Sequence, residues 1–173
     1  MDPEGPVLDK RGGAIENARV RLTQRWTDQV SWTDSDGAFH FSDVPRRSVY
    51  VRVDAEGFPP AFRVLDVRAS IRHEVSLAQG GVLELRVLDA DGTPVSAGSF
   101  TIWWNLESKL SADLDGLFDV YKLDPSGTTR LRREAATYRV GVWDTTTGQS
   151  AYVHPEVRES ETTAVEVRLE RKR

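Results

Sequence analysis

Two short acidic segments have residue types that could bind calcium. Asp34–Gly37 (Asp-Ser-Asp-Gly) and Asp113–Gly116 (Asp-Leu-Asp-Gly) each place two carboxylates just before a glycine. Calcium takes six to eight oxygen ligands, and an EF-hand loop ends in a glutamate at its twelfth position. Here the carboxylates stop after two. We interpret both segments as hairpin turns, in which aspartate accepts backbone N–H groups and glycine takes a positive φ. Replacing Asp36 by alanine is expected to cost about 1 kcal/mol through lost turn hydrogen bonds.

The three histidines and the lack of cysteine leave little catalytic chemistry for these residue types. His40, His73 and His154 lie in separate segments without the short spacing of a metal site. His40 is placed between Phe39 and Phe41, which predicts that it points outward. The sequence has no cysteine, so disulfides, thiolate metal sites and cysteine nucleophiles are excluded. An enzyme would need a pocket with converging polar groups. We predict no catalytic residue, no metal and no cofactor.

The tryptophans are the candidate contact residues. Alternation along Phe100–Trp104 predicts Trp103 on the outer face of a strand, with Phe100, Ile102 and Trp104 inside. Trp26 and Trp32 flank one predicted hairpin. An outward tryptophan can stack on a sugar ring or anchor a protein partner. The same rings can instead cover a sheet edge or pack at a domain junction, and both interpretations stay open.

An internal repeat sets the organisation of the chain. Val7–Ile15 returns as Val87–Val95, 80 residues later, and Asp34–Phe39 returns as Asp113–Phe118, 79 residues later. Two landmarks that keep nearly the same spacing indicate two folding units of about 80 to 90 residues. The predicted domains are 1–79 and 80–173, the second with an insertion near 124–136.

Each unit reads as strands and turns, with no amphipathic helix. Alternating or β-branched runs recur between turn residues such as Gly, Asp and Pro. The predicted strands are 18–26, 30–33, 38–41, 48–54, 62–67, 71–77, 82–88, 99–104, 117–122, 137–143, 150–153 and 163–169, with an optional short one at 128–131. About seven short strands in some 85 residues is typical of an antiparallel β-sandwich. The predicted fold is all-β, with two tandem antiparallel β-sandwich domains.

The predicted core has two layers in each unit. Val49, Val51 and Val53 share one strand face, as do Tyr138, Val140 and Val142 in the second unit. The facing layer is expected to contain Phe39 and Phe41 in the first unit, and Phe118 and Val120 in the second.

Charge and hydropathy limit the classes of partner that the chain is expected to bind. The net charge of −4 gives no electrostatic reason to expect nucleic acid. No apolar run approaches the ~20 residues of a membrane helix, so no membrane insertion is expected. The first residues lack the features of a signal peptide, and the first strand is short. We expect a piece of a longer chain from the cell envelope or the extracellular space, with a cytoplasmic location left open.

The motifs of the first unit resemble a known family. Val7-Leu-Asp9, Gly13-Ala-Ile15, Thr33–Phe39 and Val49–Phe58 together resemble the carboxypeptidase regulatory-like family, also described as prealbumin-like or transthyretin-like β-sandwiches with an Ig-like architecture. The second unit is similar, but its Gly98-Ser-Phe100 replaces a small residue, any residue and valine. The resemblance implies an accessory domain of a larger protein.

The resemblance and the residues together predict a function. We expect a non-catalytic accessory, spacer or protein-interaction module of a larger cell-envelope or extracellular protein, bound to a protein partner or to domains of its parent protein. The alternative is a carbohydrate-binding module that uses exposed Trp26, Trp32 or Trp103. An exposed aromatic ring with Asn or Asp nearby would favour that alternative.

Overall fold

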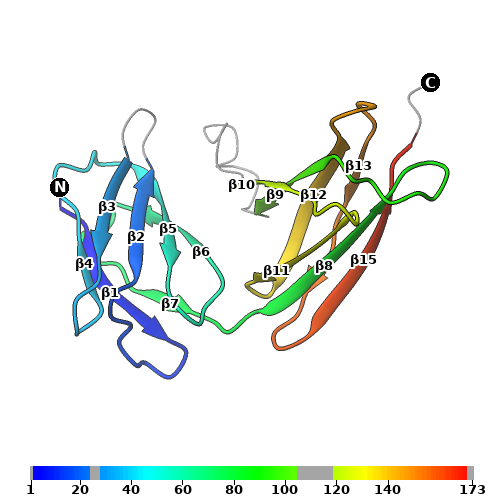
Figure 1. Cartoon of the computed structure of the whole chain (residues 1–173). Helices are drawn as coiled ribbons and strands as arrows, with labels where there is room; N and C mark the ends of the chain where they lie inside the picture. The colour runs from blue at the N-terminus through cyan, green and yellow to red at the C-terminus, as the bar shows by residue number, and fades with distance from the viewer. Residues whose placement is uncertain (1, 24–27, 105–118, 171–173) are drawn as a thin grey trace. The chain divides into compact units, whose positions relative to one another are not determined.

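The computed structural model describes residues 2–23, 28–104 and 119–170. Contacts divide the chain into two compact units, Met1–Gln79 and Gly80–Arg173, called here the first and second unit. The described residues form strands and turns and no helix, which confirms the predicted all-β fold (Figure 1).

The first unit contains two sheets. Its strands are β1 (Glu4–Asp9), β2 (Arg19–Thr23), β3 (Asp28–Trp32), β4 (Ala38–His40), β5 (Ser48–Asp54), β6 (Ala61–Asp66) and β7 (Val75–Leu77). One sheet has the order β4-β1-β7 and the other β3-β2-β5-β6. All pairs are antiparallel except β1 with β7, which are parallel with Val7 opposite Val75.

The second unit repeats this pairing. Its strands are β8 (Gly81–Leu88), β9 (Gly98–Trp104), β10 (Asp119–Lys122), β11 (Thr128–Arg133), β12 (Ala136–Asp144), β13 (Ser150–Val153), β14 (Glu156–Val157) and β15 (Thr162–Arg168). The sheets run β11-β8-β15 and β10-β9-β12-β13, with β14 added to β12. Here β8 and β15 are the parallel pair. The predicted β-sandwich fold is confirmed, and in each unit one strand pair is parallel, whereas the others are antiparallel.

Strand alternation produces the core of each unit. Val49, Val51 and Val53 on β5 are buried, and Phe39 on β4 faces them from the smaller sheet in one apolar cluster. The outward position of His40, next to Phe39, is confirmed. Burial of such side chains contributes about 1.5–3 kcal/mol each before entropy is counted.

The second core takes its aromatic rings from a different sheet. Val120 is 56% exposed, so its predicted inward position is wrong, and Phe118 lies outside the described residues. Val120 belongs to β10, which pairs with β9 as β3 pairs with β2. Among the described residues, the fully buried rings of this core are Phe100 and Tyr138 on the larger sheet. A close-packed interior can be filled from either sheet as long as the space is filled.

The extra residues of the second unit lie between its second and third strands. Thr33 N donates to Ala18 O in the first unit, and Leu123 N donates to Gly98 O in the second. The offset between the units thus grows from 80 residues at Ala18 and Gly98 to 90 at Thr33 and Leu123. The added length falls in the segment that contains 105–118, between β9 and β10.

Two predictions for the second unit are therefore wrong. The insertion is not near 124–136, because β11 and β12 follow there in the same order as β4 and β5. The counterpart of Asp34–Gly37 is Asp124–Gly127, because the two turns make the same backbone hydrogen bonds. Asp113–Gly116 lies outside the described residues.

Candidate functional site

The carboxylate of Asp34 organises the turn between β3 and β4. Its Oδ1 accepts the N–H groups of Asp36 at 3.0 Å and Ala38 at 2.8 Å. Gly37 has a φ of 74°. The predicted turn is confirmed, but the expectation for Asp36 is wrong, because Asp36 contributes its backbone N–H group while Asp34 contributes the carboxylate.

Three further turns have the same geometry. The Oδ1 of Asp9 accepts the N–H groups of residues 11 and 13, that of Asp89 accepts those of 91 and 93, and that of Asp124 accepts those of 126 and 128. In each turn the residue three positions after the aspartate is a glycine at positive φ. These carboxylates serve local turns. Among the described residues, no group of three or more His, Asp or Glu is placed to hold a metal ion.

Asp34→Ala should destabilise the first unit by about 1 kcal/mol, because two backbone N–H groups lose their acceptor. Asp36→Ala is the matched control and should leave the unfolding midpoint nearly unchanged, since its N–H group remains. Denaturant unfolding followed by circular dichroism measures both. Millimolar calcium should leave the thermal midpoint of the wild-type protein unchanged, and a rise of several degrees that Asp34→Ala abolishes would show that the turn binds the ion.

Asp124 should titrate well below an ordinary aspartate. The hydroxyl of Ser126 donates to its Oδ1 at 2.6 Å, and that of Thr128 donates to its Oδ2 at 2.7 Å. These bonds, with the backbone N–H groups, lower its pKa from 3.8 to about 2. The folded pKa is below the unfolded one, so the contribution to stability is complete above about pH 3.8 and is lost as the pH falls through 2.

Carboxyl-carbon NMR titration measures this pKa directly. Ser126→Ala and Thr128→Val should each raise the pKa of Asp124, Ser126→Ala by the larger amount. Thr129→Val is the matched control and should leave it in place. An unchanged pKa in both hydroxyl variants would show that the backbone N–H groups alone lower it.

Of the predicted contact residues, Trp103 lies on the outer face of β9, as predicted. Phe100 and Ile102 are buried, whereas the side chain of Trp104 lies outside the described part of the chain. The guanidinium of Arg139 lies 5.2 Å from the ring of Trp103 and 4.7 Å from that of Tyr152.

The Trp103 ring crosses the backbone of the neighbouring strand. A Cβ at Gly141 would lie 2.7 Å from Trp103 Cζ3 and 2.9 Å from Tyr152 Cε1, so glycine there lets both rings approach. Trp103 is thus half-buried among neighbours of its own sheet. Trp26 lies outside the described residues.

Trp32 has a different environment. It ends β3, an edge strand of the larger sheet in the first unit, and its side chain is 62% exposed. It lines two hollows of the first unit. The structure does not bring Trp32 and Trp103 together in one unit, since Trp103 belongs to the second.

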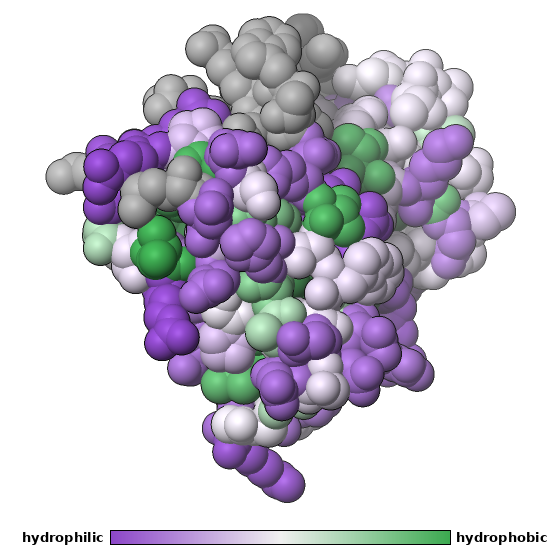
Figure 2. Space-filling view, turned by 90° about the vertical axis from the view of Figure 1, so that its left-hand side faces the viewer, coloured by the Kyte–Doolittle hydropathy of each residue, from purple (hydrophilic) through white to green (hydrophobic). Residues whose placement is uncertain are grey.

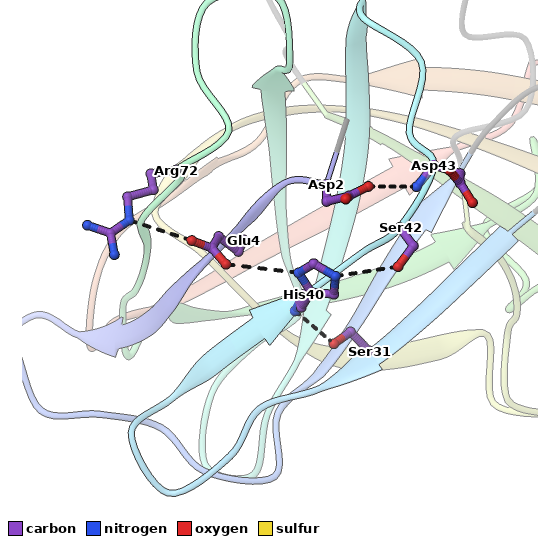
Figure 3. A network of polar contacts seen from close by, with 7 residues as sticks. All are labelled: Asp2, Glu4, Ser31, His40, Ser42, Asp43 and Arg72. Atoms are coloured by element: carbon purple, nitrogen blue, oxygen red, sulfur yellow. Dashed lines mark hydrogen bonds and ion pairs between the residues drawn. The ribbon is translucent and has the colours of Figure 1, made fainter.

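The larger hollow, of about 800 Å³, lies where β1, β3 and β4 meet the segment before β7. Its lining residues are Glu4, Gly5, Pro6, Ser31, Trp32, Asp34, Ala38, Phe39, His40, Arg72, His73 and Glu74. Four of these lining residues, Glu4, Ser31, His40 and Arg72, belong to the polar contacts drawn in Figure 3. Glu4 lies 4.0 Å from His40 Nδ1 and 3.6 Å from Arg72 Nε. His40 Nε2 is 3.4 Å from Ser42 Oγ, and its backbone N–H donates to Ser31 Oγ at 3.1 Å.

The two histidines of the larger hollow contact residues of their own unit. His73 Nε2 donates to the carbonyl of Ser70 at 2.8 Å, which fixes the ring beside the chain. His40 lies within the network of Figure 3. Such side chains can donate or accept hydrogen bonds at a ligand's edge. His154, the third histidine of the sequence, is an exposed residue of the second unit.

The smaller hollow, of about 380 Å³, is also lined by Trp32. Its lining residues are Asn17, Arg19, Trp32, Asp54, Ala55, Glu56, Phe58 and Pro60. Arg19 stands directly opposite both Trp32 on β3 and Asp54 on β5. Arg52 Nε donates to both carboxylate oxygens of Asp54, at 2.8 and 3.0 Å. Cross-strand partners lie on one face of a sheet, so the three residues form a row.

The face of the molecule presented in Figure 2 is mostly polar. On the face presented in Figure 2, apolar residues are separated from one another by hydrophilic ones. No helix long and apolar enough to cross a membrane occurs in the part of the chain that the structure describes. An isolated exposed ring beside polar hollows fits contact with a partly polar ligand.

Comparisons with known proteins agree with the strand pattern. Residues 4–78 match the family described as carboxypeptidase regulatory-like domain. No curated protein matches the sequence.

Several solved structures are similar to the chain. The Bacillus anthracis TIE protein is 14% identical with a TM-score of 0.42, over 97% of this chain and 33% of that one, so this chain spans about a third of its length. A minor pilin of Streptococcus agalactiae is 14% identical with a TM-score of 0.40, over 96% of this chain and 95% of that one. The shaft pilin of Lactobacillus rhamnosus is 12% identical with a TM-score of 0.39, over 99% and 97%.

The family match and the strand pairing cover the same residues. The match spans 4–78, and the seven strands of the first unit begin at Glu4 and end at Leu77. The first unit of this chain therefore matches the carboxypeptidase regulatory-like domain family over the residues that form its seven strands.

Proposed function

We propose that this chain is a non-catalytic accessory module of a larger cell-envelope or extracellular protein, and that it holds its parent protein to surrounding material through Trp32. The observation that carries the proposal is the exposed indole, 62% accessible and shared by two hollows. A tryptophan left in water forgoes much of the free energy that its burial would contribute. Contact with a partner recovers that free energy, and exposed tryptophans are common anchors of interfaces.

The second unit is proposed to be a further domain of the same family. Support comes from the strand pairing, since β8 pairs with β11 and β15 as β1 pairs with β4 and β7. The aspartate turns support it too, because Asp89 and Asp124 occupy the places of Asp9 and Asp34. In this role the second unit acts as a spacer.

Sedimentation with cell envelopes tests the proposed function. Purified residues 1–173 are mixed with insoluble envelope material of the source organism, and the bound fraction is measured after centrifugation. The wild-type protein should sediment with the envelope, and Trp32→Ala should bind at least about tenfold more weakly. Tyr152→Ala is the matched control, because Tyr152 is 57% exposed but lies in the second unit.

The outcomes decide between the components of the proposal. Equal binding of Trp32→Ala and wild type would show that Trp32 is not the contact. Absence of binding by the wild-type protein would overturn the proposed function. Circular dichroism of each variant confirms that the strands remain folded.

A further inference from the structure

The row beside Trp32 has the components of a sugar site. Trp32, Arg19 and Asp54 stand on three neighbouring strands, paired directly opposite one another on the outer face of the sheet. Adjacent strands are about 5 Å apart, so the row extends for about 10 Å. An indole face, a guanidinium and a carboxylate follow in order. An indole stacks on the C–H face of a pyranose ring, and the two charged groups hydrogen-bond to hydroxyls.

The smaller hollow continues this row with both apolar and polar walls. Phe58 and Pro60 supply carbon surface, whereas Asn17 and Glu56 supply an amide and a carboxylate. The hollow therefore presents hydrogen-bond donors and acceptors around apolar surface, within about 380 Å³. A ligand rich in hydroxyls satisfies such a mixture, because each hydroxyl both donates and accepts.

The charges around the row favour an uncharged ligand. Arg52 holds the carboxylate of Asp54 through two hydrogen bonds, so that charge is already paired. Arg19 and Glu56 contribute opposite charges to the same hollow. The smaller hollow thus has no excess of either sign, and the lining of the larger one includes three carboxylates and one guanidinium, so neither hollow attracts a phosphate or a polyanion.

Trp32 lines both hollows, which points to a chain of sugars. A ring stacked on the indole would lie next to the smaller hollow and to the larger one. In the larger hollow Ser31, His40 and Arg72 offer polar groups for the next sugar. We propose that the first unit binds a neutral polysaccharide, with one sugar on Trp32 and its neighbours in the two hollows. This inference rests on the proposed function and names the class of ligand for the same site.

Titration with defined oligosaccharides tests the inference. The probes are maltohexaose, cellohexaose, xylohexaose and the hexamer of N-acetylglucosamine, with polygalacturonate as the anionic control. Binding is followed through the ¹⁵N-resolved indole N–H resonance of Trp32, assigned with Trp32→Phe, and by calorimetry. At least one neutral probe should shift the Trp32 resonance in a saturable way. The resonance of Trp103 should remain in place.

Variants separate contact from folding. Trp32→Ala should weaken the binding of that probe by at least about tenfold, Trp32→Phe by less, and Arg19→Gln by about threefold to tenfold. Tyr152→Ala should bind like wild type. Because calorimetry uses the wild-type protein alone, the detection of binding does not depend on whether any variant folds.

Treated envelopes distinguish this inference from the proposed function. Periodate cleaves vicinal diols, which 1,4-linked N-acetylglucosamine lacks, so chitinase replaces periodate if that hexamer is the probe that binds. The matching treatment should abolish sedimentation with the envelope, whereas protease treatment should leave it unchanged. Loss on protease treatment with survival after periodate would mean a protein partner, which overturns the sugar inference while the proposed function stands. A panel in which no neutral probe moves the Trp32 resonance, or in which polygalacturonate binds best, would also overturn the inference.

Discussion

Alanine at Gly37 is expected to destabilise the first unit far more than alanine at Gly12, although both glycines occupy turns of the same kind. Their φ angles are 74° and 82°, in the left-handed region that costs other residues about 1–2 kcal/mol. A Cβ at Gly37 would lie 2.6 Å from Val7 O and 3.2 Å from Ile15 N. At Gly12 no atom lies within 4 Å of that position.

The contact at Gly37 is difficult to relieve because it involves backbone atoms. Val7 N donates to Gly37 O at 2.8 Å, and Val7 O accepts from Ile15 N at 3.0 Å. Moving either strand away breaks these bonds. We therefore expect about 1 kcal/mol for Gly12→Ala and about 3 kcal/mol or more for Gly37→Ala.

The second unit repeats the comparison independently. A Cβ at Gly127 would lie 2.8 Å from Val87 O and 2.9 Å from Val95 N, whereas at Gly92 the space is open. Gly127→Ala should therefore cost much more than Gly92→Ala. Guanidinium unfolding followed by circular dichroism gives the four free energies. Equal costs within either pair would show that the close approach is relieved by small movements.

The sequence predicts well those strands whose pattern has a period of two. The predicted strands 48–54 and 150–153 match β5 and β13. In β5 every second residue is a buried valine, so one face of the strand is unambiguous. The segment 71–77 was predicted as a whole strand, but only Val75–Leu77 pairs as one. Its first residues instead make isolated bonds, such as Glu4 N to Ile71 O.

The register of the second unit is harder to predict, because the turn demands few residues. Asp113–Gly116 precedes a phenylalanine, as Asp34–Gly37 does, which makes it the better match by eye. The turn itself needs only an aspartate and, three residues later, a glycine, and Asp124–Gly127 supplies both. The second unit does not need a phenylalanine after this turn, because Phe100 supplies a ring to its core from another strand.

A pair of changes in side-chain size, at residues far apart in the sequence, also cannot be predicted from a local pattern. In the first unit Ala18 N donates to the hydroxyl of Thr33 at 2.8 Å. Leu123 stands in the place of Thr33, and a Cβ at Gly98 would lie 2.5 Å from its Cδ1. In this arrangement the side chain of the larger leucine occupies the space beside the smaller glycine. The change from Ala18 in the first unit to Gly98 in the second is thus related to a residue 25 positions away in the sequence.

The candidate site shows the same limit. The sequence singled out Trp32 by residue type and by its place at a hairpin. It could not indicate the hollows, because Asn17, Asp54 and Pro60 come together only through the pairing of β2, β3 and β5. Nor could the sequence show that Trp32 is exposed whereas Trp103 is half-buried, because this difference depends on the neighbours that cover each ring. Burial of Trp103 by Arg139 is a cross-strand effect with no local signal.

The fragment 80–173 is expected to fold on its own, whereas 93–173 is not. The second unit has an apolar cluster made only of its own residues. Three members of that cluster, Leu83, Leu85 and Val87, belong to β8. This strand is the middle one of β11-β8-β15, so its removal leaves two strands without a partner and opens the core.

The start of the folding fragment follows from the contacts at its first residues. Ser160 N donates to Gly80 O at 2.8 Å, and a Cβ at Gly81 would meet the carbonyls of Arg158 and Glu161, so both glycines are part of the second unit. Fragment 80–173 should show a cooperative thermal transition and near-ultraviolet circular dichroism from its buried Tyr138. Fragment 93–173 should show neither. Cooperative unfolding of both fragments would mean that β8 is dispensable, and failure of both would mean that the second unit needs the first to fold.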